Sequence, residues 1–194
     1  MAQIRMRIEA TKKLFTVDEY CRMAEAGILA ENDRVELIEG EIIQMSPIGR
    51  KHAARVDRAT DLFTAAFRGK AIVRVQNPVR LNLYNEPVPD IALLKYRSDY
   101  YESQHPSPED VLLIFEISDT TLRYDRNVKL PIYANCGIPE AWIQDVKGNA
   151  LLVYRDPAGK RYKTQITLHQ GETIALVAFP DITLRVDELL GQAG

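Results

Sequence analysis

The sequence has little of what several common protein classes require. It contains two cysteines, Cys21 and Cys136, without paired spacing, so neither a disulfide framework nor a thiolate zinc site is indicated. The longest unbroken apolar runs, residues 111–115 and 174–179, are far shorter than the roughly 20 residues that a membrane-spanning helix needs. The glycines form neither a dinucleotide fingerprint nor a phosphate-binding loop, and the three histidines lack paired zinc spacing.

A large excess of charge of one sign is also missing. The chain carries 25 Lys and Arg against 27 Asp and Glu, so its net charge is −2. This balance excludes a protein held on nucleic acid or membrane by bulk charge, although a local basic patch remains compatible with it. The amino-terminal residues contain no apolar signal-peptide core, so we expect a cytoplasmic protein without membrane contact. With 194 residues and no linker or repeat, we expect a single domain over residues 1–194.

Hydrophobic periodicity and turn residues predict a mixed order of helices and strands. Thr16 and Glu19 have the spacing of a capping box, which predicts a first helix through Ala26. The third predicted helix has Asp125 as its expected cap. The order predicts an α/β or α+β fold with a mixed sheet. We expect helices at 16–26, 51–68 and 126–135, and strands at 34–38, 41–45, 72–83, 88–95, 111–118, 141–146, 151–155, 161–167 and 173–178.

Glu116 is the most informative residue of the predicted strands. Strand alternation places it on one face with Leu112, Ile114 and Ser118, within an otherwise apolar segment. A carboxylate buried there must be neutralised, paired or bound to a cation. A paired structural carboxylate and a hydrated strand end are the alternatives to a functional role.

Asp90 and Lys129 could complete a site around Glu116. Asp90 opens another apolar strand, and two such carboxylates on neighbouring strands would form an oxygen-ligand site suited to Mg²⁺ or Mn²⁺. Lys129 shares a helical stripe with Ile132 and Tyr133, so it projects toward the apolar side of its helix. The alternatives are a turn aspartate at 90 and a lysine whose ammonium stays at the rim of the core.

Several short motifs follow one another in a specific order. They are Pro-Asp at 89–90, Glu-Ile-Ser at 116–118, Lys129, Tyr133, GIPEAW at 137–142 and, upstream, ELIEGEIIQMSP at 36–47 with His52. In this order they resemble the PD-(D/E)XK nuclease superfamily, and the upstream residues resemble its Uma-two family of restriction-endonuclease-like proteins. The resemblance covers about residues 16–190. It implies a restriction-endonuclease-like core, with a central mixed sheet flanked by helices and an added N-terminal hairpin and C-terminal strands.

The resemblance also implies metal-dependent hydrolysis of DNA. By it, Asp90 and Glu116 match the metal-binding acids, with Mg²⁺ or Mn²⁺ as the cofactor. Glu36 matches a further acidic position, for which Glu41 is a rival. The sequence departs from the superfamily at Ser118, where the pattern has a lysine, and Lys129 is expected to take that role in the transition state.

The remaining expectations concern the substrate. His52 and Ser118 are candidate phosphate contacts, and a structural role for His52 is the alternative. A catalytically inactive module that binds nucleic acid or protein is the alternative to an endonuclease, and a homodimer would suit cleavage of both DNA strands. The basic candidates for DNA contact are Lys51, Arg55 and Arg58 on one helical face, joined by Arg50, Arg123 and Arg126.

Overall fold

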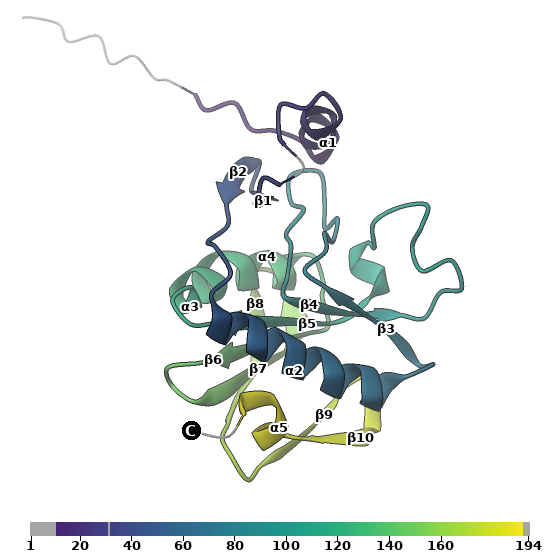
Figure 1. Ribbon diagram of the computed structural model, residues 1–194, viewed down its shortest axis with the longest axis vertical. Coiled ribbons are helices and arrows are strands. Elements are labelled where there is room, and N and C mark those ends of the chain that lie inside the picture. Colours follow the sequence, from purple (N-terminus) through teal and green to yellow (C-terminus); the bar gives the residue numbers. More distant parts are fainter. Residues whose placement is uncertain (1–10, 31, 192–194) are drawn as a thin grey trace, which may run out of the picture.

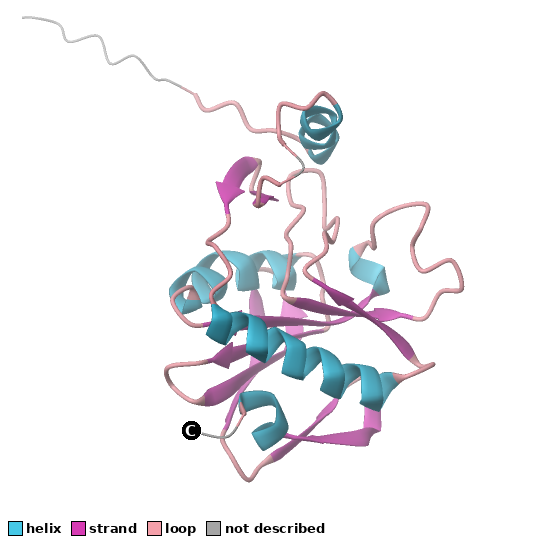
Figure 2. Cartoon of the chain, viewed as in Figure 1, coloured by secondary structure: helices cyan, strands magenta, loops and turns pink. Residues whose placement is uncertain are grey.

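A six-stranded mixed sheet lies at the centre of the computed structural model, which describes residues 11–30 and 32–191 (Figures 1 and 2). β5 and β6 run parallel, and the other neighbouring strands run antiparallel. This confirms the predicted class, a mixed sheet flanked by helices. In spatial order the strands are β3 (Ala71–Val75), β4 (Ile91–Lys95), β5 (Val111–Ser118), β6 (Glu140–Asp145), β7 (Ala150–Ala158) and β8 (Arg161–Leu168).

Each face of the sheet buries its own hydrophobic core. On one face α2 (Arg50–Phe67) buries Val56, Ala59, Phe63 and Phe67, the stripe that its 3.6-residue period predicts. The Phe63 ring meets the β5 residue Phe115 edge to face, with ring centroids 5.5 Å apart. The same core includes residues of β9 (Thr173–Leu176), β10 (Phe179–Arg185) and α5 (Val186–Leu190). β10 and α5 were not predicted from the sequence, whose last expected strand is 173–178.

The alternation predicted for β5 holds over most of the strand. Phe115 lies in the core beneath α2, and Ile114 in the core of the opposite face. It fails at the start, where a β-bulge between Leu93 and Leu94 pairs Leu94 with Val111. The bulge reverses the expected sides, so Val111 packs with Ile114 and Leu112 with the α2 core.

A helical segment over residues 122–135 covers the second face. It consists of α3 (Leu122–Tyr124), a π-helical turn η2 (Asp125–Lys129) and α4 (Leu130–Asn135). The predicted start at 126 with Asp125 as the cap is therefore wrong. Asp125 lies inside the helix, and Leu130 donates its N–H to the Asp125 carbonyl five residues back. The π-helical turn ends two residues before Pro131, which lacks an N–H for a regular helical bond.

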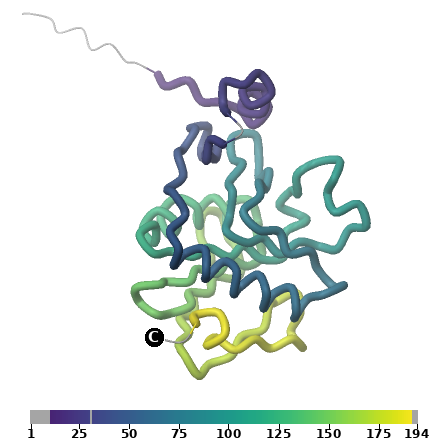
Figure 3. Tube along the Cα trace, viewed as in Figure 1, coloured from purple at the N-terminus to yellow at the C-terminus, as the bar shows by residue number. Residues whose placement is uncertain are grey.

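The N-terminal elements pack beside one end of the sheet (Figures 1 and 3). They are α1 (Val17–Glu25), with the predicted capping box at Thr16, and the hairpin of β1 (Val35–Ile38) and β2 (Glu41–Gln44). Backbone hydrogen bonds between Leu37 and Glu86 join the hairpin to the chain that leads into β4. None of the described helices is long and apolar enough to cross a bilayer.

Two predicted strands are shorter in the structure. The strand expected at 72–83 ends at Val75, because Gln76 has a φ of +49° and Pro78 follows. The strand expected at 88–95 begins at Ile91, after Pro89, since proline cannot donate to the ladder. Both changes place polar side chains just outside the sheet, beside the end of β5.

Candidate active site

A pocket of about 560 Å³ opens where β5 ends and the helical segment begins. Its walls come from the N-terminal hairpin, the chain that enters α2, the start of β4 and the first turns of the helical segment. Glu36, His52, Asp90, Glu116, Asp125 and Lys129 are among its lining residues. In sheets of this kind ligands commonly bind at the carboxyl ends of strands.

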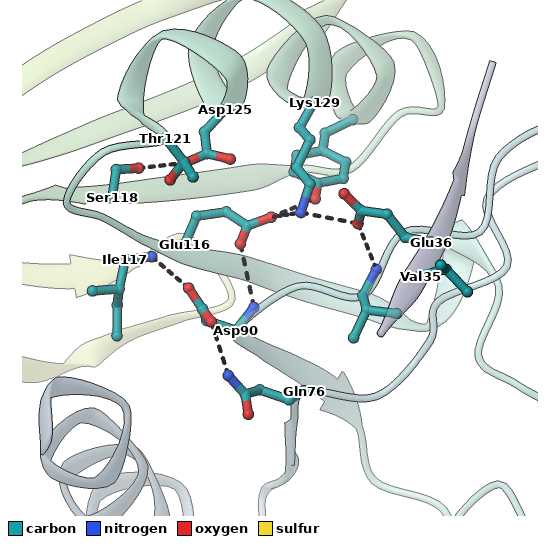
Figure 4. A network of polar contacts seen from close by, with 12 residues as sticks. Val35, Glu36, Gln76, Asp90, Glu116, Ile117, Ser118, Thr121, Asp125 and Lys129 are labelled. Carbon is teal, nitrogen blue, oxygen red and sulfur yellow. Dashed lines mark hydrogen bonds and ion pairs between the residues drawn. The ribbon is translucent and has the colours of Figure 1, made fainter. Parts of the chain in front are cut away.

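Glu116 lines this pocket and accepts hydrogen bonds from three donors (Figure 4). Its Oε1 accepts from Lys129 Nζ at 3.2 Å and from the Tyr133 hydroxyl at 2.6 Å. Its Oε2 accepts from the Asp90 backbone N–H at 3.3 Å. Tyr133 stands one helical turn after Lys129, so both donors reach the same oxygen. Glu116 is 5% exposed, which makes these contacts necessary for a carboxylate.

Burial and charge shift the pKa values of both Glu116 and Lys129. Burial raises the pKa of Glu116 to about 8, against the opposing effect of the Lys129 ammonium. Burial also disfavours the charged form of Lys129, but Glu116 and Glu36 outweigh it and hold the pKa of Lys129 above its usual value. Lys129 is therefore an ammonium at neutral pH. A protonated amine can stabilise negative charge, but it cannot accept a proton.

Asp90 is fixed by three donors from three elements. Its Oδ1 contacts His52 Nε2 of α2 at 2.8 Å and accepts from Gln76 Nε2 at 3.2 Å. Its Oδ2 accepts from the Ile117 backbone N–H at 2.8 Å, so Asp90 and the 116–117 segment of β5 bind each other reciprocally (Figure 4). The hydrogen bond to Asp90 raises the pKa of His52.

Two residues beside this cluster, Gln76 and Asp125, were not predicted to be part of it. Gln76 was expected inside a strand, and no role was expected for its side chain. The positive φ of Gln76 turns the chain out of β3 at the point where the side chain meets Asp90. Asp125 was expected to cap a helix. It is 5% exposed and accepts from the Ser118 hydroxyl at 2.6 Å and the Thr121 hydroxyl at 2.7 Å.

The hairpin places its two candidate acids differently. Glu36 Oε2 lies 3.1 Å from Lys129 Nζ and accepts from the Val88 backbone N–H, also at 3.1 Å. Glu41, its rival, is exposed and forms an ion pair with Lys12 at 2.8 Å. Glu36 is therefore the hairpin acid that joins the cluster.

Only some of the other predicted substrate contacts face the pocket. Ser118 is fully buried and donates to Asp125, so it does not face the pocket. Arg50 and Lys51 line the pocket, with Arg34 from the hairpin side.

The other predicted basic contacts point elsewhere. Arg55 donates to the Lys51 carbonyl, and Arg58 packs so closely on Gly191 that a Cβ there would collide with its guanidinium. Arg126 lines a different pocket, and Arg123 is exposed on α3. The predicted stripe of Lys51, Arg55 and Arg58 is thus not a single surface facing the pocket.

Asp90 and Glu116 offer carboxylate oxygens to the pocket as potential metal ligands. Within residues 11–30 and 32–191, no group of three or more His, Cys, Asp or Glu side chains converges as a ready-made metal cage. Asp90 and Glu116 form a pair of acids, and magnesium is commonly held by one or two carboxylates together with water and substrate phosphates.

Comparisons with known proteins identify the fold and the family. A search of curated proteins finds no match. A solved structure of a putative nuclease from Anabaena variabilis is similar in fold, with a TM-score of 0.70 and 17% sequence identity. The similarity covers 91% of this chain and 97% of that one. The family Uma2, described as "putative restriction endonuclease", matches residues 17–187. This match spans most of the sequence, and the chain therefore belongs to the Uma2 family, as its motifs predict.

Proposed function

We propose that the protein is an endonuclease that hydrolyses DNA phosphodiester bonds with a divalent cation held by Asp90 and Glu116. The observation that carries the proposal is the convergence of Asp90, Glu116 and Lys129, far apart in sequence, in one pocket. Membership of the Uma2 family, described as "putative restriction endonuclease", supports the reaction class.

The two carboxylates fit a hard cation such as Mg²⁺ or Mn²⁺. Among the described residues, Asp90 Oδ2 accepts one hydrogen bond, from Ile117, and Glu116 Oε2 accepts one, from Asp90. A carboxylate oxygen has two acceptor positions, so each of these oxygens retains one for a cation. When bound, the cation would polarise the scissile phosphate and lower the pKa of a coordinated water.

The side chains around the acids have distinct roles in this proposal. His52 and Gln76 orient Asp90, and Tyr133 orients Glu116. Lys129 stays an ammonium and offsets the negative charge that develops on the phosphorane. Glu36 holds Lys129 from the side opposite Glu116. Lys129 thus occupies the role that the lysine of the superfamily motif has, and Ser118 instead supports Asp125.

Positive charge at the pocket supports an anionic substrate. Arg34, Arg50 and Lys51 line the pocket outside the acidic cluster. Cationic side chains there can bind the phosphates that flank the reacting one, which a chain of net charge −2 cannot attract by its bulk charge.

Plasmid nicking tests the proposal directly. The wild type is incubated with supercoiled DNA and Mg²⁺ or Mn²⁺, beside Asp90→Asn, Glu116→Gln and the control Glu41→Gln. The control removes an acid of the same hairpin that contacts Lys12 at the surface. We expect metal-dependent nicking by the wild type and the control, and its loss in the other two. Equal background in all four proteins would refute the enzyme and favour a module that only binds.

A further inference from the structure

A second pocket borders the same helical segment as the candidate active site. It measures about 360 Å³ and lies between this segment and the β7–β8 hairpin. Asp125 and Lys129 of the π-helical turn line the first pocket, whereas Arg126 and Asn127 of that turn line the second. One turn of helix therefore presents side chains to both pockets.

The second pocket is cationic. Arg126, Lys160 and Arg161 line it, and no acid among the described residues does. None of these three cations forms an ion pair with a described residue. Three positive charges without an ion-pair partner at one pocket make the local potential positive, which favours an anionic ligand.

Aromatic and polar groups surround these charges. The rings of Tyr154 and Tyr162 lie side by side, with centroids 6.1 Å apart, and Gln165 donates to the Tyr154 hydroxyl at 3.4 Å. Burial raises the pKa of Tyr154, and the charge of the Arg126 guanidinium opposes this rise. Arginine forks beside aromatic rings suit phosphate groups and nucleobases.

We propose that this basic pocket, lined by Arg126, Lys160, Arg161, Tyr154, Tyr162 and Gln165, binds a phosphodiester of the nucleic-acid strand outside the reacting bond. The identity of the ligand as a nucleic-acid strand rests on the proposed function. A helix with its side chains is about 10–12 Å across, which about three nucleotides span at 3.4 Å each. The strand would thus cross the helical segment between the two pockets.

Strand binding without cleavage tests this inference. Fluorescence anisotropy follows a labelled 20-nucleotide single strand and the matching duplex, in chelator, with the full chain. The pocket variant is Arg126→Ala with Arg161→Ala, and the control is Arg68→Ala with Lys70→Ala. Both double variants remove two exposed positive charges, but the control does so where α2 meets β3.

We expect the pocket variant to weaken strand binding at least tenfold and the control less than twofold. The slope of log K against log salt should fall by about 1–2 in the pocket variant, since each lost phosphate contact lowers it by about 0.7–0.9. Equal weakening by both variants would show general charge attraction and overturn the proposal, as would no weakening by either. All four substituted side chains are exposed, and a thermal melt checks that each variant folds.

Two further measurements complete the test. One distinguishes a strand phosphate from a free nucleotide as the ligand, and the other distinguishes this inference from the proposed hydrolysis. A deoxynucleoside monophosphate that binds the wild type but not the pocket variant, with strand binding unchanged, would identify a free-nucleotide site and overturn the strand proposal. A wild type that binds strands through this pocket but does not nick DNA with Mg²⁺ or Mn²⁺ would support this inference and refute the hydrolytic one.

Discussion

Glu116 and Glu140 are both buried glutamates beside a cation, and they lie at opposite ends of the parallel pair β5–β6. Glu140 begins β6 and contacts Trp142 Nε1 and two nitrogens of Arg155, each at 2.7 Å, and the Val177 N–H at 2.8 Å. Three of these contacts converge on Oε1, and Oε2 accepts from the Val177 N–H.

Glu116, near the end of β5, is served by three donors and borders the larger pocket beside Asp90. Glu140 lines neither of the two pockets described above. Burial of a carboxylate in an apolar strand therefore does not distinguish a structural ion pair from a candidate site. A second acid beside the glutamate and access to a pocket do.

The largest expected difference between the two glutamates concerns activity. Glu116→Gln should lower the nicking rate by at least about 100-fold, because it removes a carboxylate that the proposed cation and Lys129 both require. Glu140→Gln, measured at a temperature where it is folded, should keep the rate within about threefold of the wild type. An equal loss of nicking rate in both variants would show that Glu116 has no role in activity beyond that of Glu140.

Stability should show the opposite order. Glu140→Ala leaves Arg155 and the Trp142 N–H without their acceptor, so it should lower the free energy of unfolding by about 3–5 kcal/mol. At pH 5, Glu116→Gln should change it by less than about 1.5 kcal/mol, since Lys129 keeps Glu36 as its partner. Urea denaturation measures both. A larger loss for Glu116→Gln would make Glu116 the structural ion pair instead.

A smaller effect is expected at the groups that orient Asp90. Gln76→Ala and His52→Asn each remove one donor to Asp90 Oδ1 and should raise the Mn²⁺ concentration for half-maximal nicking about tenfold. At saturating Mn²⁺ the rate should largely recover, which a general packing defect would not allow. Asn77→Ala, which changes the next residue along the chain, is the matched control.

The last expected difference is a dependence of stability on pH. Burial raises the pKa of Glu116 to about 8, from an ordinary value of 4.5, against the opposing charge of Lys129. The folded state therefore binds more protons than the unfolded state between these values, and stability falls as the pH rises through this range.

Glu116→Gln removes this titration. Its melting temperature relative to the wild type should therefore rise from about pH 5 to about pH 8, in the absence of divalent ions. A difference that stays constant over this range would contradict the account.

Local sequence signals predicted most of the elements. The Thr16 capping box, the hairpin around Glu39-Gly40 and the inward stripe of α2 depend on neighbouring residues, and all three are present. The β-bulge opposite Val111 and the π-helical turn before Pro131 depend on tertiary packing, so periodicity could not indicate them.

The candidate site was predictable in part for the same reason. Asp90, Glu116 and Lys129 interrupt apolar patterns, and this interruption marked them. Gln76 interrupts no pattern, and Asp125 was assigned the more common role of a helix cap. Both meet their partners only because β3 ends early and the helical segment begins at Leu122.

Locating a bound manganese ion tests the central claim most directly. Anomalous diffraction from crystals soaked in Mn²⁺ would place the ion, with Glu116→Gln crystals as the control. The account predicts one strong peak bound directly by carboxylate oxygens of Asp90 and Glu116, and its loss in the variant. A peak elsewhere, or none at this pair in the wild type, would contradict the account.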